Sequence, residues 1–223
     1  MKSSLFFFIL ALALMVTPGC AIFRDSFEAD TVGSKPATSP PGSPSDDRLN
    51  LQGSANSAIV IASVPLTSQA LKIDRTSVLP ETIVECVTGG GLHTSGQYSI
   101  NLKAYAEADQ SKLTMSVRST SGKNALELDY IGGRYSLKSG DGQQLLVGVY
   151  SPGAVHFIHI SIDMDRSKFS VDINGVVLAA DKSFLDASFE DLRLLRFEYV
   201  AAILEAFPGK YIVDDIEIKA IIL

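Results

Sequence analysis

The chain has 223 residues, of which 46% are apolar and 20% are charged, and its formal net charge is −6. This balance is typical of a folded globular protein and excludes an intrinsically disordered chain. The length suits one domain that can build a core without a disulfide or a metal. The acidic charge and the lack of a dense run of Lys and Arg disfavour nucleic acid as a partner.

The first residues have the pattern of a secretory leader, with Lys2 followed by an apolar run over residues 5–16. A helix needs about 20 apolar residues to cross a membrane, so this shorter run predicts a cleaved signal peptide. The stretch Thr17-Pro18-Gly19-Cys20 resembles the lipobox of bacterial lipoproteins. That resemblance implies a signal peptide at residues 1–19 and a lipid on Cys20. An ordinary secreted protein that is cut near Gly19, with Cys20 as a plain thiol, is the alternative.

The lipoprotein resemblance also implies a location. Several acyl chains would anchor the protein to the membrane of the cell envelope almost permanently. Ala21 follows the cysteine, in place of the Asp associated with inner-membrane retention, which implies the outer membrane. If Cys20 is lipidated, Cys86 has no disulfide partner, and its apolar surroundings at residues 82–87 predict a small core residue.

After the leader, the sequence predicts one domain over residues 20–223. Residues 34–47 contain four prolines among Ser, Gly and Thr, which predicts an extended loop. Apolar and polar residues then alternate at 113–118 and at 126–130, and Gly132-Gly133 indicates a tight hairpin.

The same alternation continues towards the C-terminus. It covers residues 158–163 and 169–173, where Asn174-Gly175 indicates another hairpin, and a last strand is expected at 211–222. Many short strands without helices between them predict an all-β fold with two antiparallel sheets packed as a sandwich. A parallel sheet is excluded because it needs crossover helices.

Three stretches together resemble concanavalin A-like and laminin-G-like jelly rolls. They are Asp25-Ser26-Phe27-Glu28 with the residues up to Pro36, the hairpin at 156–175, and the closing strand at 210–218. The resemblance implies two curved antiparallel sheets in which the first and last strands are neighbours. The family includes carbohydrate-binding modules, glycosidases, lyases and adhesion domains, so the fold does not settle the function.

Asp214 stands out in the last predicted strand. It shares one face with Ile212, Ile216 and Ile218 by the period of two, so it is expected to point into the core unless a bulge intervenes. A buried carboxylate is costly without partners. Hydrogen bonds from Ser, Thr or backbone N–H groups are one solution to this cost.

A structural calcium ion is the other solution, and here the family resemblance supplies the expectation. Related jelly rolls often bind calcium between the first and last strands. The resemblance implies Glu28 and Asp214 as ligands, with Asp25 and Asp215 as possible additions. Backbone carbonyls would have to complete the six to eight oxygens that calcium takes.

Aromatic side chains are the candidates for sugar binding, because their faces stack on the apolar face of a sugar ring. The chain has no Trp, so Tyr130 and Tyr135 beside the Gly-Gly hairpin are the predicted ligand-binding pair. A cross-strand packing contact between the two rings is the alternative.

Catalytic patterns are missing from the sequence. It has no G-x-S-x-G, P-loop or H-E-x-x-H motif, and no strand carries the closely spaced carboxylates of the family's glucanases. We therefore predict a non-catalytic lipoprotein of the cell envelope whose sandwich binds a glycan or a protein partner. A structural or adhesion role without a small ligand is the second hypothesis, and a carbohydrate-active enzyme is the third.

Overall fold

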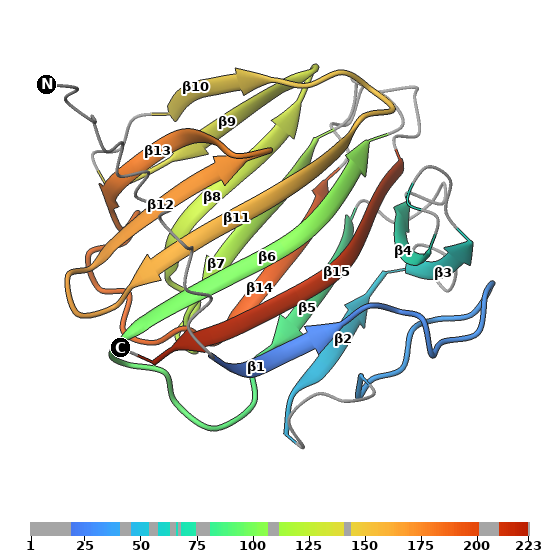
Figure 1. Cartoon of the computed structure of the whole chain (residues 1–223), viewed down its shortest axis with the longest axis horizontal. Helices are drawn as coiled ribbons and strands as arrows, with labels where there is room; N and C mark the ends of the chain where they lie inside the picture. Colours follow the sequence, from blue (N-terminus) through green and yellow to red (C-terminus); the bar gives the residue numbers. More distant parts are fainter. Residues whose placement is uncertain are drawn as a thin grey trace, which may run out of the picture.

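The computed structural model describes residues 19–40, 46–53, 58–62, 66, 68–74, 81–106, 112–140, 144–200 and 210–222. The regular elements among these residues are all β-strands (Figure 1). No helix in the described part of the chain has the length and apolarity to span a membrane. In chain order, the strands are β1 (Cys20–Asp25), β2 (Arg48–Gln52), β3 (Ala58–Ala62), β4 (Gln69–Asp74), β5 (Glu81–Val87), β6 (Gln97–Ala106), β7 (Leu113–Arg118), β8 (Asn124–Ile131), β9 (Arg134–Lys138), β10 (Gln144–Val149), β11 (Val155–Asp163), β12 (Lys168–Ile173), β13 (Val176–Ser183), β14 (Leu194–Val200) and β15 (Lys210–Ile221).

The strands form two antiparallel sheets that pack face to face. The sheet in front in Figure 1 has eight strands in the order β13-β12-β11-β6-β15-β4-β3, with β1 also paired to β15. The back sheet has seven strands in the order β10-β9-β8-β7-β14-β5-β2. This arrangement confirms the predicted all-β jelly-roll sandwich.

Strict alternation in the sequence explains why the long strands have one buried face. Burial alternates residue by residue along β6, β11 and β12, so every second side chain enters the space between the sheets. One continuous cluster of apolar side chains fills this space. A smaller cluster of Leu66, Ala70 and Ile212 lies on the outward face of the front sheet.

Both predicted hairpins are present. Gly132 and Gly133 connect β8 to β9 with φ angles of 57° and 72°, and Asn174 and Gly175 connect β12 to β13 with φ angles of 54° and 76°. A two-residue hairpin loop of this kind needs positive φ at both positions, which Gly and Asn tolerate best.

The last strand, β15, has β6 along one edge and shares the other edge between two strands. Its first part pairs with β4 and its second part pairs with β1. The expected neighbourhood of the first and last strands is therefore observed. A bulge lies between the two parts, where the register with β6 shifts between Asp214 and Glu217 and Asp215 has a φ of 49°.

This bulge changes the face to which Asp214 belongs. Asp214 lies opposite Lys103, on the outward face of the front sheet, whereas Ile218 lies opposite Ile100 and faces the core. Asp214 is expected from the sequence to point inward with Ile216 and Ile218 unless a bulge intervenes, and the bulge interrupts the period of two, so Asp214 faces the other side of the sheet. Asp214 is nevertheless fully buried, and the Ser68 hydroxyl donates a hydrogen bond to it at 2.7 Å.

The N-terminal predictions fall partly outside the described residues. Residues 1–18, which hold most of the predicted signal peptide, lie there, as do residues 41–45 of the proline-rich stretch. The described parts of residues 34–47 contain no strand and lie on the connection from β1 to β2.

Candidate functional site

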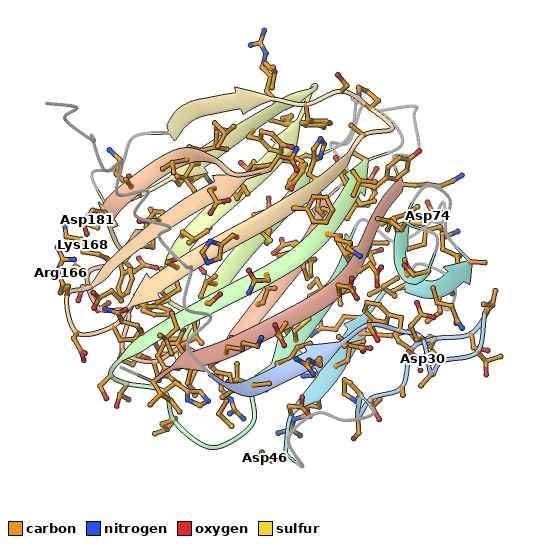
Figure 2. All side chains as sticks on the ribbon, viewed as in Figure 1. Asp30, Asp46, Asp74, Arg166, Lys168 and Asp181 are labelled. Atoms are coloured by element: carbon orange, nitrogen blue, oxygen red, sulfur yellow. The ribbon has the colours of Figure 1, made fainter. Side chains whose placement is uncertain are left out.

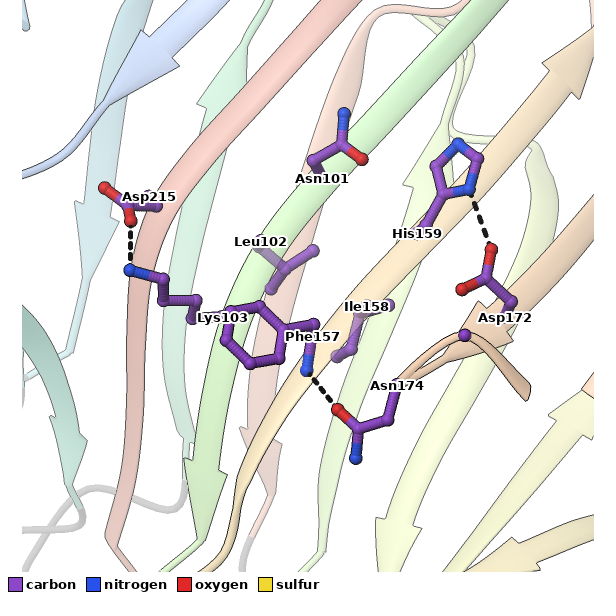
Figure 3. Close-up of a pocket in the computed structure, with 10 residues that line it drawn as sticks. Asn101, Leu102, Lys103, Phe157, Ile158, His159, Asp172, Asn174 and Asp215 are labelled. Carbon is purple, nitrogen blue, oxygen red and sulfur yellow. Dashed lines mark hydrogen bonds and ion pairs between the residues drawn. The ribbon is translucent and has the colours of Figure 1, made fainter. Parts of the chain in front are cut away.

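An open groove of about 580 Å³ lies on the outward face of the front sheet (Figure 3). Strands β6, β11 and β12 form its floor, and the turn after β12 and the bulge of β15 border it. Most side chains here belong to the outward half of each alternating strand, whereas Leu102 and Ile158 are buried and point inward. The groove is lined by Asn101, Leu102, Lys103, Phe157, Ile158, His159, Asp172, Asn174, Gly175 and Asp215.

Phe157 is the aromatic side chain of this groove, and 57% of its surface is exposed. Its backbone is fixed by the neighbouring hairpin, because the N–H of Phe157 donates to Oδ1 of Asn174 at 2.9 Å. The N–H of Asn174 in turn donates to the carbonyl of Phe157 at 2.8 Å. These two hydrogen bonds fix the backbone from which the exposed Phe157 ring projects.

An ion pair borders the groove on the side of β15. Nζ of Lys103 lies 2.5 Å from Oδ2 of Asp215, the residue at positive φ in the bulge. The hydrogen bond from Lys103 to Asp215 raises the pKa of the lysine above its usual value, although partial burial opposes the shift. The bulge therefore places the Asp215 carboxylate beside the groove, within reach of Lys103.

A second polar pair lies on the side of β12. Nδ1 of His159 is 2.8 Å from Oδ2 of Asp172, which is its direct cross-strand neighbour. Asn101 lies opposite His159 on β6, and its amide donates to the hydroxyl of Ser99 at 2.9 Å. Amide, imidazole, carboxylate and ammonium groups therefore surround the Phe157 ring, which is a mixture suited to a ligand with an apolar face and polar edges.

Gly175 lies in the lining of the groove, in the turn after β12. Its φ of 76° disfavours any other residue, and a Cβ placed there would meet no atom within 4 Å. The glycine is therefore required by the turn and not by crowding.

The sequence nominated Tyr130 and Tyr135 as the ligand-binding pair, and the structure places both inside the core. Only 2% and 3% of their surfaces are exposed. They are direct cross-strand partners on β8 and β9, with ring centroids 5.0 Å apart in an edge-to-face arrangement. This geometry corresponds to the packing alternative, because a ligand at the surface cannot reach either ring.

The four predicted calcium ligands point in different directions. Asp25 lies opposite Ile216 and faces the core, whereas Asp214 faces outward. Glu28 accepts a hydrogen bond from the N–H of Gln69 at 2.8 Å, and Asp215 is paired with Lys103. Among the described residues, no group of three or more His, Cys, Asp or Glu side chains is arranged to hold a metal ion. The calcium ion therefore stays a prediction.

Asp25 has the most unusual environment of the four. Its Oδ1 accepts a hydrogen bond from the N–H of Phe27 at 2.8 Å, whereas Oδ2 is buried without a hydrogen-bond partner. Burial, reinforced by the charges of Asp30 and Asp47, raises the pKa of this carboxyl from 3.8 to about 7. Asp25 therefore keeps its proton to a much higher pH than an ordinary carboxyl group.

The two cysteines have opposite environments. Cys20 is exposed at the first position of β1, and Cys86 is fully buried in β5. Burial raises the pKa of the Cys86 thiol, so this residue stays a neutral core side chain as the sequence predicts. The exposed thiol of Cys20 is sterically available for modification.

Sequence reasoning missed Phe157, although a signal for it was present. In the stretch 156–163, the apolar isoleucines occupy one phase of the alternation and polar residues occupy the other. Phe157 falls in the polar phase and His156 falls in the apolar phase. An aromatic residue in the wrong phase of an otherwise regular strand indicates an exposed ring.

Comparisons with known proteins identify the fold and nothing narrower. No known family profile matches the chain, and no curated protein matches its sequence. Among solved structures, a sialidase superimposes with a TM-score of 0.62 at 11% identity, over 77% of this chain and 17% of its own length. The chain is a concanavalin A-like jelly-roll β-sandwich.

Two further matches show the range of proteins with this fold. The catalytic domain of a glycoside hydrolase family 131 protein from Coprinopsis cinerea has a TM-score of 0.59 at 12% identity, over 90% of this chain and 94% of its own. A structure of botulinum neurotoxin type C, whose cell entry depends on interaction with two ganglioside molecules, has a TM-score of 0.59 at 11% identity. That match covers 91% of this chain and 48% of the toxin chain, so this chain spans about half of it.

Proposed function

We propose that this protein is a non-catalytic binding module that recognises a glycan in the groove around Phe157. The observation that carries the proposal is the exposed Phe157 ring, surrounded by the polar side chains of Asn101, Lys103, His159 and Asp172. Sugars have apolar ring faces and hydroxyl edges, which match an aromatic platform with polar groups at its border. The fold supports the proposal, because it is shared with carbohydrate-active enzymes and a toxin that interacts with gangliosides.

A protein partner is the alternative ligand, and the character of the groove favours the glycan. Protein interfaces are typically built around a contiguous apolar patch at their centre. In this groove, Phe157 is the exposed large apolar side chain, and the outward groups on either side of it are charged or amide. A concave surface in which one exposed ring is bordered by polar side chains is closer to what a sugar requires.

The non-catalytic part of the proposal rests on how the carboxylates of the groove are engaged. Glycoside hydrolysis needs one carboxyl group that transfers a proton and a second that activates water or attacks the sugar. Asp172 is held by His159, and Asp215 is held by Lys103. Both carboxylates therefore act as fixed parts of the border of the groove.

We also propose that a lipid on Cys20 holds the domain at the cell envelope, in the outer membrane. The exposed position of Cys20 at the start of β1 supports this, because a lipid there would be attached directly to the sheet. A Cys20→Ser variant should move from the membrane fraction to the soluble fraction when cells are fractionated. An unchanged distribution would contradict the anchor and would leave the groove proposal intact.

The test of the groove is a glycan array with the soluble Cys20→Ser domain and its Phe157→Ala variant. The variant should lose about tenfold or more in affinity, because a central aromatic contact contributes about 1–2 kcal/mol. Phe157→Trp should retain or improve binding. Leu92→Ala is the matched control, because Leu92 is also an exposed apolar residue, at 70%, but lies outside the groove.

Two results would overturn the proposal. One is glycan binding that survives Phe157→Ala unchanged, which would place the site elsewhere. The other is release of a shorter glycan during incubation with the wild-type domain, which would make the protein a carbohydrate-active enzyme. Loss of binding in the Leu92→Ala control would mean that the assay measures non-specific binding through exposed apolar residues.

A further inference from the structure

We propose that the ligand is an extended, uncharged oligosaccharide that lies along β11 and occupies the Phe157 groove and a second depression at the other end of the same strand. This inference rests on the proposed function and gives it a ligand class. It follows from the position of the second depression, from the small residues between the two, and from the pairing of the charges.

The second depression, of about 170 Å³, lies on the front sheet at the turn between β11 and β12. Asp163 ends β11 there, and Lys168 begins β12. Figure 2 shows Arg166, Lys168 and Asp181 together at this end of the sheet. Neither the sequence motifs nor the Phe157 groove accounts for this depression.

The two depressions lie on one line along the sheet. From Phe157 to Asp163 is six residues of one strand, which at about 3.3 Å per residue spans about 20 Å. That length holds several sugar rings of an extended chain. Phe157, His159, Ser161 and Asp163 all belong to the half-exposed or exposed phase of β11, so they line the same face.

A row of serines crosses the middle of this line. Ser161 lies directly opposite Ser99 on β6 and Ser170 on β12, so three serines form a row across the three strands. Serine is small, and each hydroxyl can both donate and accept a hydrogen bond. Ser161 and Ser170 themselves line the second depression, so the row forms the side of that depression towards the Phe157 groove, and it offers hydroxyl groups to a chain that crosses it.

The charges along this line are mostly paired, which favours an uncharged ligand. Lys103 is held by Asp215, and Nη2 of Arg166 lies 3.1 Å from Oδ2 of Asp181. Lys168 donates to the hydroxyl of Ser183 at 2.9 Å.

The net charge of the side chains along this line also disfavours an acidic ligand. Four carboxylates and three Lys or Arg side chains line the two depressions. The carboxylates are those of Asp163, Asp172, Asp181 and Asp215. An acidic sugar would have to displace an existing carboxylate partner and would meet a small excess of negative charge.

The experiment measures affinity by calorimetry for three ladders of oligosaccharides, each from disaccharide to hexasaccharide. Two ladders are uncharged, β-1,4-linked glucose and β-1,4-linked N-acetylglucosamine, and one is acidic, oligogalacturonate. The soluble Cys20→Ser domain should bind at least one uncharged ladder, with affinity that rises about tenfold or more from the disaccharide to the longer members. It should bind oligogalacturonate more weakly at every length.

Two variants separate the two parts of the line. Ser161→Gln places a longer neutral side chain in the serine row, so it should weaken the longer members of the ladder more than the disaccharide and remove the gain with length. Ser188→Gln is the matched control, because Ser188 is an exposed serine outside both depressions. Phe157→Ala should weaken every member of the ladder.

The outcomes distinguish this inference from the proposed function. Binding that depends on Phe157 but does not rise with length, that is unaffected by Ser161→Gln, or that is stronger for oligogalacturonate would overturn the extended uncharged ligand alone. The absence of any Phe157-dependent binding, on these ladders and on the glycan array, would overturn both.

Discussion

Two neighbouring residues of β11 show the contrast between the core and the groove. His156 has a polar ring and is 4% exposed, whereas Phe157 has an apolar ring and is 57% exposed. From polarity alone, His156 would be expected on the exposed face and Phe157 on the buried face, and the structure shows the reverse. The comparison teaches that the period of two fixes the face of each side chain. A residue whose polarity does not suit its face then identifies the position as unusual.

The buried side of this contrast is a cluster of rings with unsatisfied polar atoms. The hydroxyls of Tyr130 and Tyr135 and Nδ1 of His156 are buried without a hydrogen-bond partner. The ring of Tyr135 contacts that of His156 edge to face, with centroids 5.6 Å apart. Burial lowers the pKa of His156, so the imidazole is neutral at physiological pH. The packing of the rings stabilises the fold, whereas the burial of their unpaired polar atoms destabilises it.

The largest predicted effect tests the packing of the buried rings. Tyr130→Ala should lower the free energy of unfolding by about 3–5 kcal/mol, because it leaves a large cavity between the sheets. Urea unfolding followed by fluorescence or circular dichroism measures this change. A loss below about 1 kcal/mol would mean that the core collapses around the missing ring, and the contrast with the groove would then be weaker than the burial indicates.

The next effect concerns Asp25, a polar group buried at another part of the core. Its pKa is raised from 3.8 in the unfolded state to about 7 in the folded state. The folded state therefore binds the proton more tightly, so this stabilisation is fully present below about pH 4 and is lost as the pH rises through about 7. Between pH 5 and pH 8, the wild-type protein should lose about 2 kcal/mol through this residue.

The matched variant is Asp25→Asn, which keeps an oxygen to accept the Phe27 N–H but cannot ionise. It should be more stable than the wild type at pH 8 and similar to it at pH 4, as measured by urea unfolding at each pH. The same pair of proteins tests the predicted calcium ion. If calcium binds the native state at Asp25, it should raise the melting temperature of the wild type at pH 8 more than that of the variant. No change in either protein would contradict the metal.

A smaller effect isolates the cost of an unsatisfied hydroxyl. Tyr135→Phe removes the Oη atom that has no partner and keeps the ring, so stability should stay level or rise by about 0.5–1 kcal/mol. Chemical denaturation of the variant beside the wild type measures the difference. A loss of more than about 1 kcal/mol would show that this hydroxyl makes a stabilising hydrogen bond, for example to a buried water molecule.

The smallest predicted effect is on the exposed side of the contrast. Phe157→Ala should change the free energy of unfolding by about 0.5 kcal/mol or less, because the ring buries little surface, yet it should abolish most ligand binding. Thermal melting and the glycan array together separate these two consequences. Equal losses of stability and binding would mean that Phe157 acts through the fold.

Much of the fold could be predicted from the sequence, because it depends on local patterns. The Asn174-Gly175 turn and the alternation at residues 169–173 before it are enough to place β12 and to indicate that a hairpin follows it. The face of Asp214 could not be predicted, since a bulge shifts the period by one residue and no turn residue announces it. Period-two reasoning holds only up to the first bulge of a strand.

The candidate site was harder to predict, because it is formed across strands. Lys103, Phe157 and Asp172 belong to three different strands, and only the register of the sheet brings them together. Tyr130 and Tyr135 attracted attention because they flank a hairpin, but position in the chain does not reveal which face of a hairpin is covered by the other sheet. The sequence feature that does indicate an exposed face is an apolar residue at a position where the alternation of the strand predicts a polar one, as at Phe157.

The pairing of β1 with β15 has a mechanical consequence. Cys20 lies opposite Ala220, so a tether at Cys20 would pull directly on the ladder between the first and last strands. From β15 the tension passes to β6 and then to β11, the strand that carries Phe157. A force between the tether and a molecule held in the groove would therefore cross one continuous sheet, and the back sheet would carry almost none of it.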